Sequence, residues 1–306
     1  MTLKIDANRI HTQLEKLATY STAPPPAVTR ILYTQSDRDA RVYIRDLMES
    51  AGLTVREDAI GNIFGRWQGE NPDLAPVVTG SHIDAIPHSG RYDGTVGVIG
   101  AIEAIHALRQ SGFEPQRSVE IIMFTSEEPT RFGIGCLGSR AMAGVLQPSD
   151  LRALHDADDT PFDDVRRTAG YIGSLDTVQL AQGTYHAFVE LHIEQGKRLE
   201  TSGNQIGIVT AIAAPATLRV QIEGQGGHAG TVLMPQRHDA LTAAAEIISA
   251  VEKTANESPS PDAVATVGLC EVYPNAVNSI PSRVLLEIDI RDIDLTSRDD
   301  MVSTIQ

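Results

Sequence analysis

The sequence has few cysteines and a shortage of positive charge. Its 306 residues include only Cys136 and Cys270, which excludes a disulfide framework and favours a reducing, cytoplasmic compartment. Lysine and arginine number 25 against 40 aspartates and glutamates, so the net charge is −15. A surface of this sign repels phosphate backbones and anionic lipids, and we therefore expect neither nucleic acid nor membranes as partners.

Long apolar runs are also absent. The N-terminus has no apolar core of signal-peptide length, and no later stretch is long enough to span a bilayer. With 42% hydrophobic and 21% charged residues, the composition is that of a globular protein. The length of 306 residues suffices for two domains, or for one large domain with an insertion.

The first part of the chain alternates strands and helices. Residues 77–80 and 118–124 are apolar and predict buried strands, and residues 94–110 between them predict a helix. This order predicts an α/β fold with functional side chains at the carboxyl ends of its strands. From about residue 213, alternating strands surround an alanine-rich helix and predict a smaller α+β layer. We expect domains at 1–212 and 213–306.

Potential metal ligands directly follow three predicted strands. They are His82, Asp84 and Asp93 after residues 77–80, Glu127 and Glu128 after residues 118–124, and His192 after a third predicted strand at residues 187–191. Any one of these residues alone is more often a solvated surface group. Three such clusters at strand ends favour a hydrolytic metal centre, and imidazole with carboxylate suits Zn²⁺ or Mn²⁺. His88 lies in the same stretch without this context and is interpreted as structural.

Five segments in fixed order resemble the M20-type metal-dependent amidohydrolases. They are GSHIDAIPHSGRYDGTVGV, FTSEEPTRFGIGCLGSR, ELHIEQG, GGHAGTVLMPQRHDA and NSIPSRVLLEIDIRDID. The resemblance covers nearly all of the chain from about Ser36 onward. Within this family, the segments most resemble the branch that contains allantoate amidohydrolases, N-carbamoyl-L-amino acid hydrolases and ureidoglycolate amidohydrolases. Their residues are most similar to those of the last group.

The resemblance implies a mixed-sheet α/β metallohydrolase domain in residues 1–212. Residues 213–306 would form a ferredoxin-like lid that also makes a homodimer. Two divalent ions per subunit are implied, Mn²⁺ ahead of Zn²⁺. The implied ligands are His82, Asp93, Glu128 and His192, with Asp93 shared by both ions.

The resemblance also implies roles for other residues. Glu127 would be the general base, and Asp84 would orient His82. His228 of one subunit would stabilise the oxyanion in its partner's site. The implied substrate contacts are Gln195, Asn278 and Arg291, in addition to His228.

The implied activity is hydrolysis of a linear amide C–N bond in a small ureido acid. Ureidoglycolate is the first expectation, with glyoxylate, ammonia and CO₂ as products in allantoin breakdown; allantoate and N-carbamoyl-L-amino acids are the alternatives. In the family, the catalytic domain resumes after the lid and supplies one more histidine ligand. No histidine follows His238, so we expect a C-terminally incomplete chain. An alternative of another class is a truncated, inactive homologue that only binds a ligand or partner.

Overall fold

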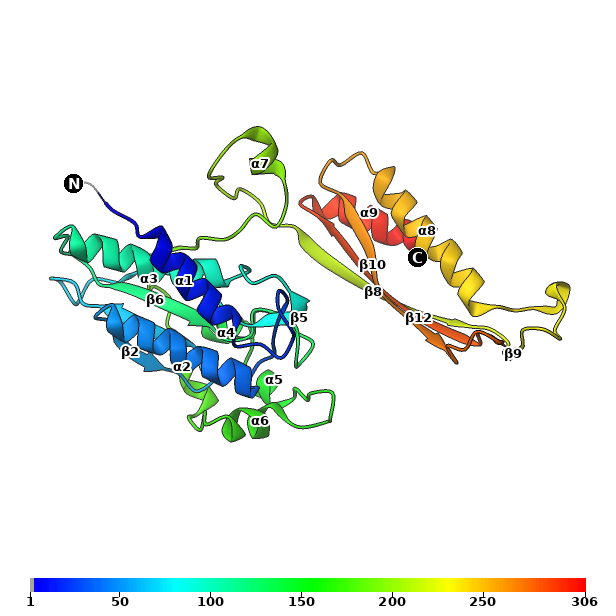
Figure 1. Ribbon diagram of the computed structural model, residues 1–306, viewed down its shortest axis with the longest axis horizontal. Helices are drawn as coiled ribbons and strands as arrows, with labels where there is room; N and C mark the ends of the chain where they lie inside the picture. The colour runs from blue at the N-terminus through cyan, green and yellow to red at the C-terminus, as the bar shows by residue number, and fades with distance from the viewer. Residues whose placement is uncertain (1–2) are drawn as a thin grey trace. The chain divides into compact units, whose positions relative to one another are not determined.

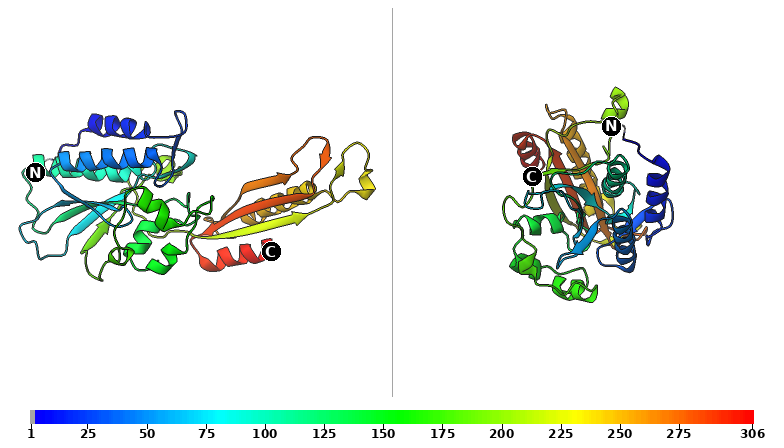
Figure 2. Two further views of the ribbon diagram at one scale, coloured as in Figure 1. Left: turned by 90° about the horizontal axis from the view of Figure 1, so that it is seen from below. Right: turned by 90° about the vertical axis from the view of Figure 1, so that its left-hand side faces the viewer.

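The computed structural model describes residues 3–306 and divides the chain into two units (Figures 1 and 2). The first unit ends at Gly203, and the second spans Asn204–Gln306. Each unit has its own sheet and its own hydrophobic core.

The first unit is built on a five-stranded sheet of order β2-β3-β6-β4-β7. Strand β4 is parallel to β6 and to β7, whereas β3 is antiparallel to β2 and β6. The sheet is therefore mixed, which confirms the predicted fold class. The strands are β2 (Thr54–Glu57), β3 (Ile63–Trp67), β4 (Val77–His82), β6 (Val119–Phe124) and β7 (Ala187–Val189).

Helices cover both faces of this sheet (Figure 2). In β6, Ile121 and Met123 pack into one core, and Ile122 between them packs into the other. Burial on both faces explains why β6 is almost continuously apolar in sequence. One face carries α1 (Ala7–Ala18), α2 (Gln35–Ser50) and α3 (Thr95–Gln110); the other carries α4 (Leu137–Met142), α5 (Pro148–Arg152), α6 (Phe162–Thr168) and the 3₁₀ turn η1 (Leu175–Thr177). Strands β1 (Val28–Arg30) and β5 (Ala85–Ser89) form a separate pair, and α7 (Arg198–Ser202) lies near the end of the unit.

The second unit has an antiparallel sheet of order β10-β12-β8 with helices packed on one face. Alternate residues of β12 face this core, where Ile288 and Ile290 meet Val251 and Met301. The elements are β8 (Ala214–Glu223), α8 (Ala240–Asn256), β10 (Val264–Tyr273), β12 (Arg283–Asp292) and α9 (Leu295–Ile305). A short pair, β9 (Gly227–His228) with β11 (Ser279–Ile280), and the 3₁₀ turn η2 (Met234–Gln236) complete the unit.

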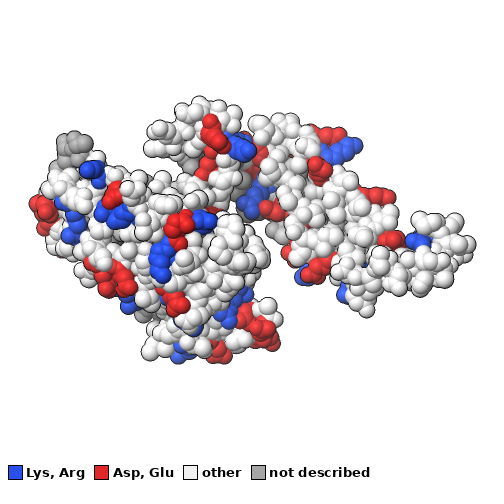
Figure 3. Space-filling view, viewed as in Figure 1, with Lys and Arg blue, Asp and Glu red and all other residues white. Residues whose placement is uncertain are grey.

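Charged side chains of both signs lie on the surface. On the face shown in Figure 3, acidic and basic side chains are interspersed within each unit. Within residues 3–306, no helix combines the length and the apolarity that a bilayer crossing requires.

The contact between β4 and β6 depends on Gly80. Its φ is +145°, and a Cβ atom there would clash with the backbone carbonyl of Ile122 in β6. Glycine alone permits this approach, because it adds no side chain and adopts positive φ freely.

We expect Gly80→Ala to lower the free energy of unfolding by about 3 kcal/mol or more, from the clash and the strained backbone together. Gly90→Ala is the matched control, because nothing lies within 4 Å of a Cβ at that position. The free energy of unfolding of Gly90→Ala should stay within about 0.5 kcal/mol of the wild-type value. Urea unfolding of both variants measures the difference, and equal losses would show that the close approach is not the constraint.

Candidate metal centre

Three of the predicted ligands meet at one place in the first unit. One ligand atom from each of His82, Asp93 and His192 lies within 4.8 Å of the other two. His192 Nε2 is 3.3 Å from Asp93 Oδ1. His82 is buried, Asp93 is partly buried and His192 is exposed, so the group is open to solvent on one side.

The local chain explains this convergence. Strands β4 and β7 are parallel neighbours, so their carboxyl ends bring His82 and His192 to the same edge of the sheet. Asp93 lies just before α3, and Gly94 after it has a φ of +63°. A Cβ at Gly94 would overlap the His82 ring. Glycine there lets the start of α3 approach the imidazole closely.

Asp84 links His82 to the segment after β6. Its Oδ1 accepts the backbone N–H of Glu127 at 3.1 Å, and its Oδ2 accepts that of Glu128 at 2.9 Å. His82 Nδ1 lies 3.1 Å from the backbone carbonyl of Asp84 and 3.5 Å from its Oδ1. The nearer partner is therefore the carbonyl, to which Nδ1–H donates. Nε2 is therefore the nitrogen that would bind a metal.

The two adjacent glutamates have different surroundings. Glu127 Oε2 lies 3.7 Å from His82 Nε2, and 43% of the Glu127 side chain is exposed. Glu128 is not a member of the three-residue group in the described part of the chain. Its role as a ligand stays a prediction from the resemblance.

The charges at this site suit a cation. Burial lowers the pKa of His82, but Asp84 and the carboxylates of Glu127 and Glu128 outweigh it and raise that pKa to about 9. Burial and the neighbouring Glu127 raise the pKa of Glu128 to about 7. Both shifts mean that protons are held where carboxylates crowd together. Imidazole and carboxylate donors in such a cluster fit a divalent metal ion, which would neutralise the same charge.

Of the predicted substrate contacts, only Gln195 lies beside the metal group, and the others belong to the second unit. Gln195 Nε2 donates to Asp93 Oδ2 at 2.6 Å, so it lies beside the metal ligands. In the second unit, His228 pairs with Ser279, directly after Asn278. Arg291 lies near the carboxyl end of β12, and its Nε donates to Asp289 Oδ2 at 2.7 Å. The segment with Asn278 precedes the amino end of β12.

The register of β12 sets the distance between these two ends. At the amino end of β12, Arg283 pairs with Glu223, the last residue of β8, and His228 follows five residues later. At the carboxyl end, Arg291 pairs with Pro215. At the usual rise of a strand, Arg283 and Arg291 are about 26 Å apart. Within one subunit, Asn278 and Arg291 therefore cannot hold the same small carboxylate, which the sequence alone did not indicate.

Two contacts to the segment after β6 were also not predicted. Asn62 Oδ1 accepts the N–H of Thr125 at 2.8 Å, and Cys136 Sγ lies 3.4 Å from Glu127 Oε1. Asn62 follows the turn before β3 and has no local signal in the sequence. Cys136 lies in the second motif that carries the resemblance, but its neighbours gave no reason to pair it with Glu127.

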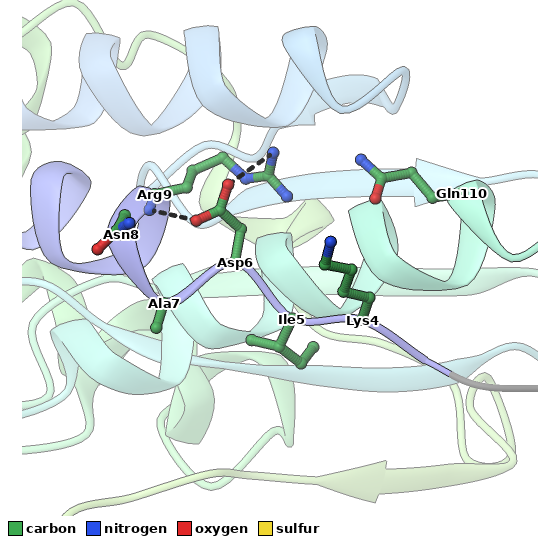
Figure 4. Close-up of a pocket in the computed structure, with 7 residues that line it drawn as sticks. All are labelled: Lys4, Ile5, Asp6, Ala7, Asn8, Arg9 and Gln110. Atoms are coloured by element: carbon green, nitrogen blue, oxygen red, sulfur yellow. Dashed lines mark hydrogen bonds and ion pairs between the residues drawn. The ribbon is translucent and has the colours of Figure 1, made fainter.

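A pocket of about 430 Å³ lies at the carboxyl end of α3 (Figure 4). Asp93 precedes the amino end of α3, so the pocket and the metal group lie at opposite ends of this helix. Asp6 caps α1 by accepting the N–H of Arg9, whose guanidinium also binds the buried Glu103. These polar groups have partners, so we interpret the pocket as part of the packing of α1. Its lining residues are Lys4, Ile5, Asp6, Ala7, Asn8, Arg9 and Gln110.

Comparison with known proteins gives consistent matches. Residues 78–276 match the Peptidase family M20/M25/M40. Ureidoglycolate hydrolase of Arabidopsis thaliana is 56% identical, and the alignment covers 99% of this chain but 65% of that protein. N-carbamoyl-L-amino-acid amidohydrolase of Pseudomonas sp. is 37% identical, over 100% of this chain and 74% of that protein. The crystal structure of AtUAH in complex with glyoxylate is 56% identical with a TM-score of 0.91, covering 99% of this chain and 73% of that chain.

We expect His82→Ala to lower the bound metal by at least about tenfold, because it removes the one buried imidazole of the group. His88→Ala is the matched control, since His88 is an exposed histidine of the same segment outside the group. Metal content after equilibration with Mn²⁺ or Zn²⁺ and desalting, measured by atomic emission, reports the result. Equal metal content in the two variants would contradict the assignment of His82.

Proposed function

The chain belongs to Peptidase family M20/M25/M40, and on that basis we propose that it hydrolyses a linear amide C–N bond in a small ureido acid, with ureidoglycolate as the substrate. The observation that carries the proposal is the grouping of His82, Asp93 and His192, with Glu127 Oε2 3.7 Å from His82 Nε2. In this proposal, Glu127 is a proton acceptor beside the metal ligands. The similarity to a ureidoglycolate hydrolase supports the choice of substrate within the class.

Divalent metal ions would be held by His82, Asp93 and His192, with Glu128 completing a second position that shares Asp93. Two ions per subunit with Mn²⁺ ahead of Zn²⁺ fit the nitrogen and oxygen donors. When bound, such ions polarise the ureido carbonyl and lower the pKa of the attacking water.

Glu127 is the proton carrier in this mechanism. Its carboxylate accepts a proton from the attacking water while the water oxygen bonds to the carbonyl carbon. The C–N bond then breaks, and the proton passes from Glu127 to the departing nitrogen. Partial exposure keeps Glu127 accessible to water and substrate. With ureidoglycolate, the final products would be glyoxylate, ammonia and CO₂.

His228 is suited to stabilise the oxyanion. Its Nδ1 accepts the backbone N–H of Gly230 at 3.0 Å. A neutral ring with this contact carries its proton on Nε2, and His228 is exposed. The Nε2–H is thus available as a donor to negative charge that develops on a carbonyl oxygen.

The separation within the second unit supports a homodimer. His228 and Asn278 lie at one end of β12, and Arg291 lies about 26 Å along the strand from Arg283. A small ureido acid cannot span that distance. The two ends can serve one substrate only if they come from different subunits, which supports the proposal that His228 acts in the site of its partner. We place this dimer in the cytoplasm, as the low cysteine content favours.

We expect Glu127→Gln to lower kcat on ureidoglycolate by about 10²- to 10⁴-fold while metal content stays unchanged. The amide keeps the shape of the side chain but cannot accept the proton. Glu114→Gln, in an exposed position outside the site, is the matched control. The assay measures ammonia release with Mn²⁺ from ureidoglycolate, allantoate and an N-carbamoyl-L-amino acid.

The three substrates separate the alternatives in the same assay. Turnover of ureidoglycolate ahead of the other two supports the proposal. If only N-carbamoyl-L-amino acids or only allantoate are turned over, that compound is the substrate in place of ureidoglycolate. If none is turned over by the wild-type chain with metal bound, the activity is refuted and the inactive, ligand-binding homologue remains.

The dimer predicts complementation between two inactive variants. His228→Ala and Arg291→Ala should each lose activity, whereas a refolded equimolar mixture should recover about a quarter of the wild-type sites, because half of the dimers are mixed and each has one intact site. A mixture of His228→Ala with Asn278→Ala is the control, since these residues share one end and would be needed from the same chain. Equal recovery in both mixtures, or none in the first, would contradict the assignment across subunits.

A further inference from the structure

Cys136 makes two contacts with Glu127. Its Sγ lies 3.4 Å from Glu127 Oε1, and its backbone N–H donates to the carbonyl of Glu127 at 2.7 Å. One residue thus holds both the main chain and the side chain of the proposed base.

The backbone at Cys136 is unusual for a residue with a side chain. Its φ is +55°, a left-handed conformation that glycine adopts with less strain. Cys136 stands at the N-cap of α4, where serine, threonine, aspartate or asparagine would normally cap the helix, and its side chain makes no cap hydrogen bond. The thiol is directed at Glu127 instead. Neither the helix nor the loop conformation therefore accounts for a cysteine at this position.

The protonation of the thiol matches this contact. Burial, followed by the neighbouring Glu127, raises the pKa of Cys136 to about 11. The sulfur keeps its proton at neutral pH, so it can donate to the carboxylate and is a poor nucleophile.

We propose that Cys136 is a positioning residue that orients Glu127 for proton transfer, an inference that rests on the proposed function. The thiol engages Oε1, which leaves Oε2 on the side of His82 Nε2, at 3.7 Å. A donor at one oxygen fixes the orientation of the carboxylate and leaves the other oxygen open to the attacking water. Without this donor, Glu127 would sample other rotamers in its partly exposed position.

The kinetic test compares Cys136→Ala with Cys136→Ser on ureidoglycolate with Mn²⁺. We expect Cys136→Ala to lower kcat about tenfold, with KM within about twofold and metal content unchanged, because only the orientation of the base is lost. Cys136→Ser keeps a donor and should restore most of kcat. Both replacements share the same backbone strain, so their difference reports the donor. Equal losses in both, or no loss in Cys136→Ala, would overturn the proposal.

Cys270→Ala is the matched control, since Cys270 is the other cysteine and is exposed in the second unit. Its kcat should equal that of the wild-type chain. This variant also leaves Cys136 as the sole thiol, so its S–H stretching band can be read by infrared spectroscopy without any turnover.

The infrared band separates this inference from the proposed function. We expect it at lower frequency than that of a free thiol, with Glu127→Ala in the Cys270→Ala background returning it to the free value. A band at the frequency of a free thiol that does not move in Glu127→Ala would overturn the contact, and with it the positioning role. A shifted band in a chain that turns over no ureido acid would instead support the contact and count against the hydrolase.

Discussion

The candidate site depends on the carboxylate of Asp84, which accepts the backbone N–H groups of Glu127 and Glu128. These two bonds join the segment after β6 to the end of β4. Hydrogen bonds to an ionised, buried acceptor are among the stronger ones in proteins, at about 1.5–3 kcal/mol each. Asp84 also receives His82 Nδ1–H on its own carbonyl, so the imidazole and the adjacent glutamates share one anchor. Losing this carboxylate would release both sides of the site together.

The same anchoring determines the charge of the candidate site. Holding Glu127 and Glu128 beside Asp84 and Asp93 concentrates negative charge around a buried imidazole, and the raised pKa values of His82 and Glu128 report that crowding. Proteins tolerate such a cluster when a metal or a proton compensates it. A bound cation would compensate the charge that the fold gathers here.

The parts of the site that follow from strand direction could be predicted from the sequence. His82 and His192 were predictable as neighbours, because parallel strands end at the same edge of a sheet. The α/β order of the first unit followed from apolar periodicity, and the mixed sheet was implied by the family resemblance. The thiol of Cys136 was not predictable, since its pairing with Glu127 is decided by how a loop folds back. Nor was the separation of Asn278 from Arg291, because it depends on the register of β12 against β8. Spacing along the chain carries neither kind of information.

Backbone strain around the site points to function rather than to loop geometry alone. Ser126, Cys136 and Gln195 are non-glycine residues with positive φ. Each one uses its side chain on a proposed site residue: the Ser126 hydroxyl donates to the carbonyl of Glu128, the Cys136 thiol to Glu127, and the Gln195 amide to Asp93. Glycine would relieve the backbone at all three positions but would remove all three contacts. Strain that persists where a simpler residue is available is compensated by what the side chain does, and here the side chains contact the proposed base and two of the proposed ligands.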